Sequence, residues 1–206
     1  MYLILPDGLQ SDGQVFVRLA AERYGCHVEL ITGLDWDKDM TPWEAEPIFK
    51  RNKVFAGKAE EYLPILENHI KQTETALGLD SQDIERCLAG VSLSGLFALW
   101  AAHRSDMFCS IACLSASFWY PGFEEWVKRS TLSPHVRRIH ISLGNREKIS
   151  KNPTFSSIED HTLAIVQHLR SLCGVTTDYR IFEGTHFSPI VPRLEEALKL
   201  LMQRQA

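Results

Sequence analysis

Long apolar runs and paired-cysteine motifs are missing from this sequence of 206 residues. No apolar stretch approaches the roughly 20 residues that a transmembrane helix needs, so we expect no membrane-spanning segment. The N-terminus has no basic region followed by a long apolar run, so we expect no signal peptide. The five cysteines are odd in number and no Cys-x-x-Cys occurs, which favours reduced thiols and a cytoplasmic location.

An excess of either charge is also missing. The sequence has 22 basic and 26 acidic residues, for a net charge of −4. This balance argues against nucleic acid or an anionic membrane as the main partner. The 45% apolar and 23% charged residues are typical of a soluble globular protein. Because no linker, repeat or low-complexity tract interrupts the chain, we expect a single domain over residues 1–206.

Strand-like apolar runs alternate along the chain with segments of helical periodicity. The alternation predicts right-handed β-α-β crossovers, and therefore a three-layer α/β fold with helices on both faces of a mostly parallel sheet. The pattern indicates about six strands. Strands are expected at Tyr2–Leu5, His27–Thr32, Ile84–Ala89, Ser110–Leu114, Ile139–Leu143 and Thr177–Phe182, and helices at Val15–Tyr24, Lys58–Leu77, Leu96–His103, Glu124–Ser130, Thr162–Cys173 and Val191–Gln203.

The stretch from Gly90 to Ser94 lies between a predicted strand and a predicted helix. A serine at such a sharp turn, called a nucleophile elbow, exposes its hydroxyl above the sheet, where it can attack an acyl carbon. The usual pattern is G-x-S-x-G, and here Ser94 replaces the second glycine. Because Ser94 is small enough for that position, Ser92 is the predicted nucleophile. The alternative is a plain turn in which Ser92 only caps the helix.

A serine hydroxyl needs a neutral imidazole that accepts its proton. Among the eight histidines, His186 directly follows the last predicted strand. Functional groups in parallel sheets gather beyond the carboxyl ends of the strands, so His186 is the predicted general base. His135, in a loop, is the remaining competitor.

The imidazole in turn needs a carboxylate that fixes its tautomer and stabilises its protonated form. Glu147 is the first acid after the strand Ile139–Leu143, and Asp160, at the start of the next helix, is the alternative. With Glu147 the order along the chain is Ser, Glu, His, which is typical of α/β-hydrolases. An oxyanion hole needs two backbone N–H groups. The Leu93 amide is one candidate, and the second is expected in the loop after the first strand, at Leu9 or a neighbour.

The segment between Gly33 and Gly57 is rich in Asp, Trp and Pro and has no regular period. Its acids imitate part of a calcium loop, but Met40 stands where such a loop needs glycine. We therefore expect no metal site, although the acids could orient polar groups of a substrate. The acids concerned are Asp35, Asp37, Asp39 and Glu46.

Aromatic side chains of two segments are candidates for the walls of a substrate cleft, since clefts are lined mainly by apolar and aromatic groups. Two lie in the acidic segment and two follow the strand after the elbow. The alternative is that the tryptophans only cover the edge of the core. The predicted substrate-binding residues are Trp36, Trp43, Trp119 and Tyr120.

The stretches around Ser92, Glu147 and His186, together with two segments nearer the N-terminus, resemble the putative esterase group of α/β-hydrolases. This group includes esterase D-like and siderophore esterases. The resemblance implies an α/β-hydrolase fold and hydrolysis of carboxylic esters, with Ser92 as nucleophile and His186 as base. It spans nearly the whole chain. The matching stretches are Leu3 to Gly8, Leu34 to Trp43, Ala89 to Ala98, Ser142 to Glu147 and Gly184 to Phe187.

Two departures from this family are visible. Ser94 replaces the common glycine, and the first two strands of the full α/β-hydrolase fold are not found. The strand His27–Thr32 would then lie at an edge of the sheet, and a bare edge is a liability. We expect the chain's own loops or a second subunit in a homodimer to cover it.

The sequence therefore predicts a cytoplasmic serine carboxylesterase that acts on a small-molecule ester through an acyl-enzyme on Ser92 and needs no cofactor. Two alternatives stay open. One is an acyltransferase on the same fold, and the other is an α/β-hydrolase-like binding protein without catalytic activity.

Overall fold

The structure is a computed structural model that describes residues 1–6, 11–48, 53–79 and 84–202. A six-stranded sheet forms its centre, in the order β2-β1-β5-β6-β7-β8, and all neighbouring strands in it run parallel. The predicted α/β fold with about six strands is confirmed. The strands are β1 Tyr2–Pro6, β2 His27–Ile31, β5 Arg86–Val91, β6 Ser110–Leu114, β7 Arg138–Gly144 and β8 Thr176–Phe182.

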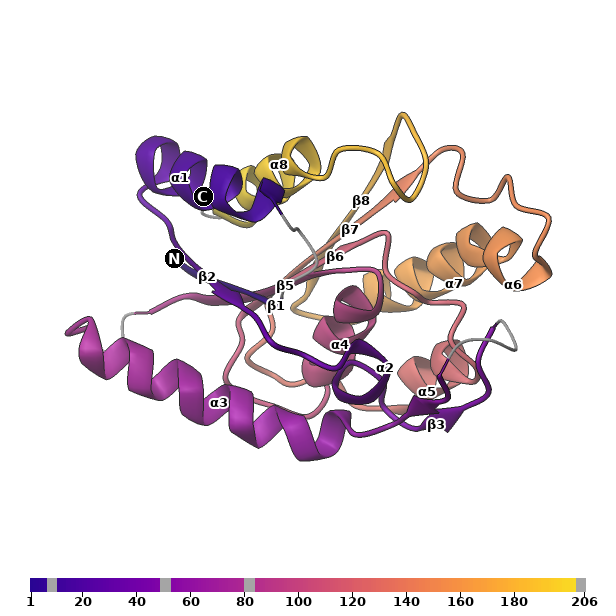
Figure 1. Cartoon of the computed structure of the whole chain (residues 1–206), viewed down its shortest axis with the longest axis horizontal. Helices are drawn as coiled ribbons and strands as arrows, with labels where there is room; N and C mark the ends of the chain where they lie inside the picture. Colours follow the sequence, from indigo (N-terminus) through magenta and orange to yellow (C-terminus); the bar gives the residue numbers. More distant parts are fainter. Residues whose placement is uncertain (7–10, 49–52, 80–83, 203–206) are drawn as a thin grey trace.

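Helices cover both faces of this sheet, which gives three layers (Figure 1). Helices α1 (Ser11–Tyr24) and α8 (Val191–Met202) bury their apolar residues on one face. The opposite face is covered by α3 (Ala59–Ala76), α4 (Leu93–Ala101), α5 (Phe123–Arg129) and α7 (Ile158–Arg170). The apolar core therefore consists of two clusters separated by the sheet. None of the described helices is both long and apolar enough to span a membrane.

Four short elements were not predicted, because two to four residues are too few to show a period. They are helix α2 (Trp36–Asp39), strands β3 (Glu44–Ala45) and β4 (Phe55–Ala56), and helix α6 (Pro153–Ser156). Strands β3 and β4 pair antiparallel, so the aperiodic acidic segment has a small sheet of its own.

Strand β2 is an edge of the main sheet, as the sequence predicted. On its inner side it pairs with β1 from the Tyr2–His27 pair to the Pro6–Ile31 pair. Glu29 of β2 accepts a hydrogen bond from Thr73 Oγ1 of α3 at 3.1 Å, so helix α3 contacts this strand. The cover of the outer side of β2 by loops or by a second subunit stays a prediction.

Candidate active site

Ser92 occupies the turn between β5 and α4 with φ 58° and ψ −122°. Few residues other than glycine adopt a positive φ, because the Cβ atom then crowds the backbone, and such strain is concentrated at functional sites. The turn is held from both sides. The Ser92 N–H donates to the Leu114 carbonyl at 3.1 Å, and the Ser92 carbonyl accepts from the Ser117 N–H at 3.0 Å. Strand β5 therefore passes into helix α4 through one strained residue, Ser92.

Small residues around Ser92 make this turn sterically feasible. A Cβ atom on Gly90 would lie 2.1 Å from the Ser94 carbonyl oxygen, and one on Gly95 would lie 2.8 Å from the Ala116 Cβ. Ser94, which replaces the usual glycine, is fully buried. Its hydroxyl donates to the Val91 carbonyl and accepts from the Val91 N–H, both at 2.9 Å. The departure from the glycine pattern thus adds two hydrogen bonds to this turn.

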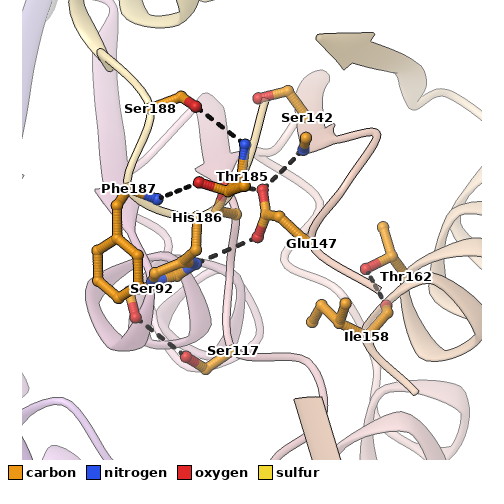
Figure 2. A network of polar contacts seen from close by, with 12 residues as sticks. Ser92, Ser117, Ser142, Glu147, Ile158, Thr162, Thr185, His186, Phe187 and Ser188 are labelled. Atoms are coloured by element: carbon orange, nitrogen blue, oxygen red, sulfur yellow. Dashed lines mark hydrogen bonds and ion pairs between the residues drawn. The ribbon is translucent and has the colours of Figure 1, made fainter. Parts of the chain in front are cut away.

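His186 and Glu147 face each other across two loops that follow neighbouring strands. The His186 Nδ1 and Glu147 Oε2 atoms are 3.1 Å apart (Figure 2). The loops are joined by hydrogen bonds from the Arg146 N–H to the Gly184 carbonyl at 2.9 Å and from the Gly184 N–H to Asn145 Oδ1 at 3.0 Å. Because β7 and β8 are parallel neighbours, both loops leave the same edge of the sheet.

The Glu147 carboxylate is almost fully buried, with 3% of its side chain exposed. Burial by itself raises the pKa of this carboxyl, but hydrogen bonds from His186, Ser115 and the Gly144 N–H outweigh it, and the resulting pKa is lowered. The Gly144 N–H lies 2.7 Å from Oε1, and Ser115 Oγ donates to the same oxygen. Glu147 is therefore ionised at neutral pH and can orient the imidazole.

The buried guanidinium of Arg193 lies 3.6 Å from the Glu147 carboxylate. We expect Glu147→Gln to lower the free energy of unfolding by about 3 kcal/mol at pH 7, because it leaves this buried cation without its carboxylate partner. Since the native pKa of Glu147 is below its ordinary value of 4.5, the wild-type advantage is complete above pH 4.5 and shrinks as the pH falls through the native pKa. Glutamine does not titrate. Urea unfolding of both proteins between pH 3 and 7 checks this, and a constant difference over that range would contradict it.

A cavity of about 520 Å³ lies over the carboxyl ends of the central strands, and Ser92, Glu147 and His186 all line it. Within the described part of the chain, the hydrogen bond of Ser92 Oγ is to Ser117 Oγ at 3.3 Å, not to His186. Hydrogen bonds of catalytic groups are often long without substrate and shorten in the complex. The other lining residues are Asp37, Ile48, Phe55, Leu93, Ser115, Ser117, Trp119, Arg146, Ile149, Ser150, Phe155, Ile158, Thr185 and Phe187.

Of the four aromatic residues predicted to bind substrate, only Trp119 is among the lining residues of this cavity. Its ring packs between Phe55 at 6.2 Å and Phe155 at 5.5 Å, both of which also line the cavity. Tyr120 is buried, and its hydroxyl donates to the Trp43 carbonyl at 2.5 Å. Tyr120 and Trp43 are thus not among the residues that line the cavity, whereas the aromatic residues Phe55, Trp119 and Phe155 are.

Trp36, the fourth of these residues, opens helix α2 and packs against the larger core cluster. Its neighbour Asp37 lines the cavity instead. Burial and the nearby Asp35 raise the pKa of Asp37, while Lys53 lowers it. Among the described residues, no group of three or more His, Cys, Asp or Glu side chains is arranged to hold a metal ion.

The remaining sequence-predicted candidates lie as follows. Leu93 follows Ser92 and is the first residue of α4. Among the described residues, no hydrogen-bond acceptor is found for its N–H. Leu9 lies outside the described residues. Asp160 is exposed on the first turn of α7, and His135 lies 3.5 Å from Asp106, so neither lines the cavity.

Sequence reasoning missed several polar residues around the site, among them Ser115, Ser117 and Arg193. Ser115 and Ser117 lie within three residues of the end of β6, so the rule that placed His186 and Glu147 could have found them. Arg193 belongs to α8, and its guanidinium lies 3.6 Å from the Glu147 carboxylate. No pattern in the sequence indicates this contact.

A model of the family described as "Putative esterase" matches residues 20–191. The chain belongs to this family. It is 31% identical over 127 residues to "Uncharacterized protein YbbA" of Bacillus subtilis, which covers 61% of this chain and 49% of that protein. The chain therefore spans about half the length of this curated relative.

Solved structures share the fold of this member of the esterase family. An IroE-like serine hydrolase from Shewanella oneidensis has a TM-score of 0.79 at 19% identity, over 97% of this chain and 69% of that chain. The siderophore hydrolase EstB from Aspergillus nidulans has a TM-score of 0.73 at 18% identity, over 98% of this chain and 82% of that chain. These neighbours confirm the α/β-hydrolase-like fold.

Proposed function

We propose that this chain is a serine carboxylesterase in which Ser92 attacks the ester carbonyl, His186 is the general base and Glu147 orients His186. The observation that carries the proposal is the strained Ser92 at an elbow that shares one cavity with the His186–Glu147 pair. Membership of an esterase family and the likeness to serine hydrolases support it.

In the proposed reaction, His186 removes the Ser92 proton as Oγ adds to the ester carbon. The Leu93 N–H stabilises the charge that develops on the carbonyl oxygen, as one donor of the oxyanion hole. His186 then protonates the leaving alcohol, which leaves the acyl group on Ser92. Finally, His186 activates a water molecule that releases the acid, so one ester and one water give one acid and one alcohol.

The test is covalent labelling by a fluorophosphonate, which reacts with an activated serine. We expect labelling of the wild type at Ser92, none in Ser92→Ala, and full labelling in Ser110→Ala, where a buried serine is removed from the amino end of β6. Wild-type protein that fails to label would instead favour a non-catalytic binding protein. Product analysis with an added alcohol separates hydrolysis from acyl transfer, because only a transferase forms a new ester.

A further inference from the structure

Arg193 is a buried cation beside the proposed site. Only 3% of its side chain is exposed, equal to the exposed fraction of Glu147, and its Nη1 lies 3.6 Å from Glu147 Oε1. Removing a guanidinium from water is costly unless an opposite charge and hydrogen bonds compensate it. Burial lowers the pKa of Arg193, and the neighbouring Glu147 raises it in part. The burial of this guanidinium therefore points to a role for Arg193 beyond packing.

The side-chain hydrogen bonds of Arg193 reach residues near the carboxyl ends of β6 and β7. Nη1 donates to Ser115 Oγ at 2.7 Å, and Nη2 donates to the Ser142 carbonyl at 2.9 Å and to Ser142 Oγ at 3.1 Å. The guanidinium carbon also lies 5.5 Å from the centre of the Phe182 ring. Arg193 thus connects helix α8 to the loops that hold the site.

Ser115 transmits this contact to Glu147. A guanidinium can only donate hydrogen bonds, so Ser115 Oγ must accept from Arg193 and turn its own proton to Glu147 Oε1. Ser115 has a positive φ of 46°, which few residues other than glycine adopt. The result is a continuous series of hydrogen bonds from Arg193 through Ser115 and Glu147 to His186.

We propose that Arg193 is a positioning residue that keeps the Glu147–His186 pair in its reactive protonation state under acidic conditions. The inference rests on the proposed function of that pair. A positive charge 3.6 Å from the Glu147 carboxylate favours its ionised form, because a proton on Glu147 would neutralise the charge that compensates the buried guanidinium. Arg193 thereby extends activity to lower pH, and its directed hydrogen bonds hold the Glu147 carboxylate in place.

The other charged or titratable groups that the structure describes around the pair leave this direction unchanged. The pKa of the Tyr179 phenol on β8 is raised by burial and, to a smaller extent, by the negative charges of Glu159 and Glu147. Arg146 and Asp37 line the cavity. Lys148 is paired with Glu159 of α7 at 2.5 Å.

The experiment is the pH dependence of the rate of fluorophosphonate labelling at Ser92, which needs no knowledge of the natural substrate. We expect Arg193→Met to shift the acidic midpoint of this profile upward by about one pH unit, because the opposing positive charge is gone. Arg193→Lys keeps the charge and should leave the midpoint near that of the wild type. Arg193→Gln, which can still donate to Ser115 and Ser142, is a second neutral variant and should shift it like methionine.

The matched control is Arg86→Met. Arg86 is also a shielded arginine, with 14% of its side chain exposed and an ion pair to Glu74, but it lies at the amino end of β5, away from the cavity. This variant should lose stability and keep the wild-type midpoint.

Three outcomes overturn the inference, and they are distinguishable. An unmoved midpoint in folded Arg193→Met and Arg193→Gln shows that the charge does not act on the pair. Failure of both neutral variants to fold makes Arg193 a purely structural ion. Absence of labelling in the wild type refutes the proposed function itself and the inference with it.

Discussion

Ser92→Ala is expected to lower kcat/KM for an ester by about 10⁴-fold or more, because the acyl group then has no acceptor on the protein. The fold should survive, because alanine keeps the backbone and loses only one hydroxyl, whose hydrogen bond to Ser117 is long at 3.3 Å. The measurement is the hydrolysis of p-nitrophenyl acetate, with urea unfolding of both proteins. A change in unfolding free energy below about 1 kcal/mol is expected.

His186→Gln should cause a loss comparable to that of Ser92→Ala, since the hydroxyl is a poor nucleophile without its base. The double variant should lose little more than either single variant, because residues that act as one unit give non-additive effects. Near-normal turnover by Ser92→Ala, or losses that multiply in the double variant, would contradict the assignment of the pair.

Gly90→Ala should disrupt the elbow and destabilise the whole protein by about 3 kcal/mol or more, an effect of the size seen when a new atom overlaps a rigid core. The added Cβ would lie 2.1 Å from the Ser94 carbonyl oxygen and 2.5 Å from the Gly95 nitrogen, and both atoms belong to the backbone. Relief therefore requires α4 to move away from β5, which displaces Ser92. We expect activity to fall together with stability.

Gly174→Ala is the matched control. Gly174 has a φ of +80°, and a Cβ atom there would meet no atom within 4 Å. The expected cost is about 1 kcal/mol, from the strain of a left-handed alanine alone, with unchanged activity per folded molecule. Urea unfolding and ester hydrolysis of both variants provide the comparison. Equal destabilisation at the two positions would mean that the close approach at Gly90 is not important.

The main sheet was predictable in large part because its central strands are buried on both faces. Such strands are continuous apolar runs, as in Tyr2–Pro6 and Ser110–Leu114, and every residue of both is buried. The same physics made the site partly predictable. Parallel strands put their carboxyl ends at one edge, so polar residues just after the strands were expected together, and His186 and Glu147 do lie within hydrogen-bond distance.

The ends of elements were less predictable, and the reason is local. Helix α4 begins at Leu93, three residues before the expected start, because the elbow turns directly from strand to helix without a loop. The expected start at Leu96 followed the apolar run, in which the small residues Ser94 and Gly95 look like turn residues. Their size serves close packing instead.

The aromatic residues show what a linear pattern cannot decide. Trp119 and its neighbour Tyr120 are equally plausible as cleft residues in the sequence, but only Trp119 lines the cavity, and Tyr120 points into the core toward Trp43. In a loop no fixed period assigns side chains to a face, so the direction depends on tertiary contacts. The contact of Arg193 could not be predicted for a similar reason. Arg193 lies on a helix, whereas its buried partner Glu147 lies on a loop far away in sequence.

The order of the site's residues along the chain has a consequence for biosynthesis. The elbow depends on β5, α4 and β6, whereas His186 and Arg193 follow β8, the last strand of the sheet. A protein is made from its N-terminus, so the Ser92 turn can form before the ribosome has made His186, the proposed proton acceptor. The hydroxyl then stays an ordinary alcohol until β8 docks on β7. On the proposed mechanism, a nascent chain of this design cannot attack the esters around it before β8 has docked.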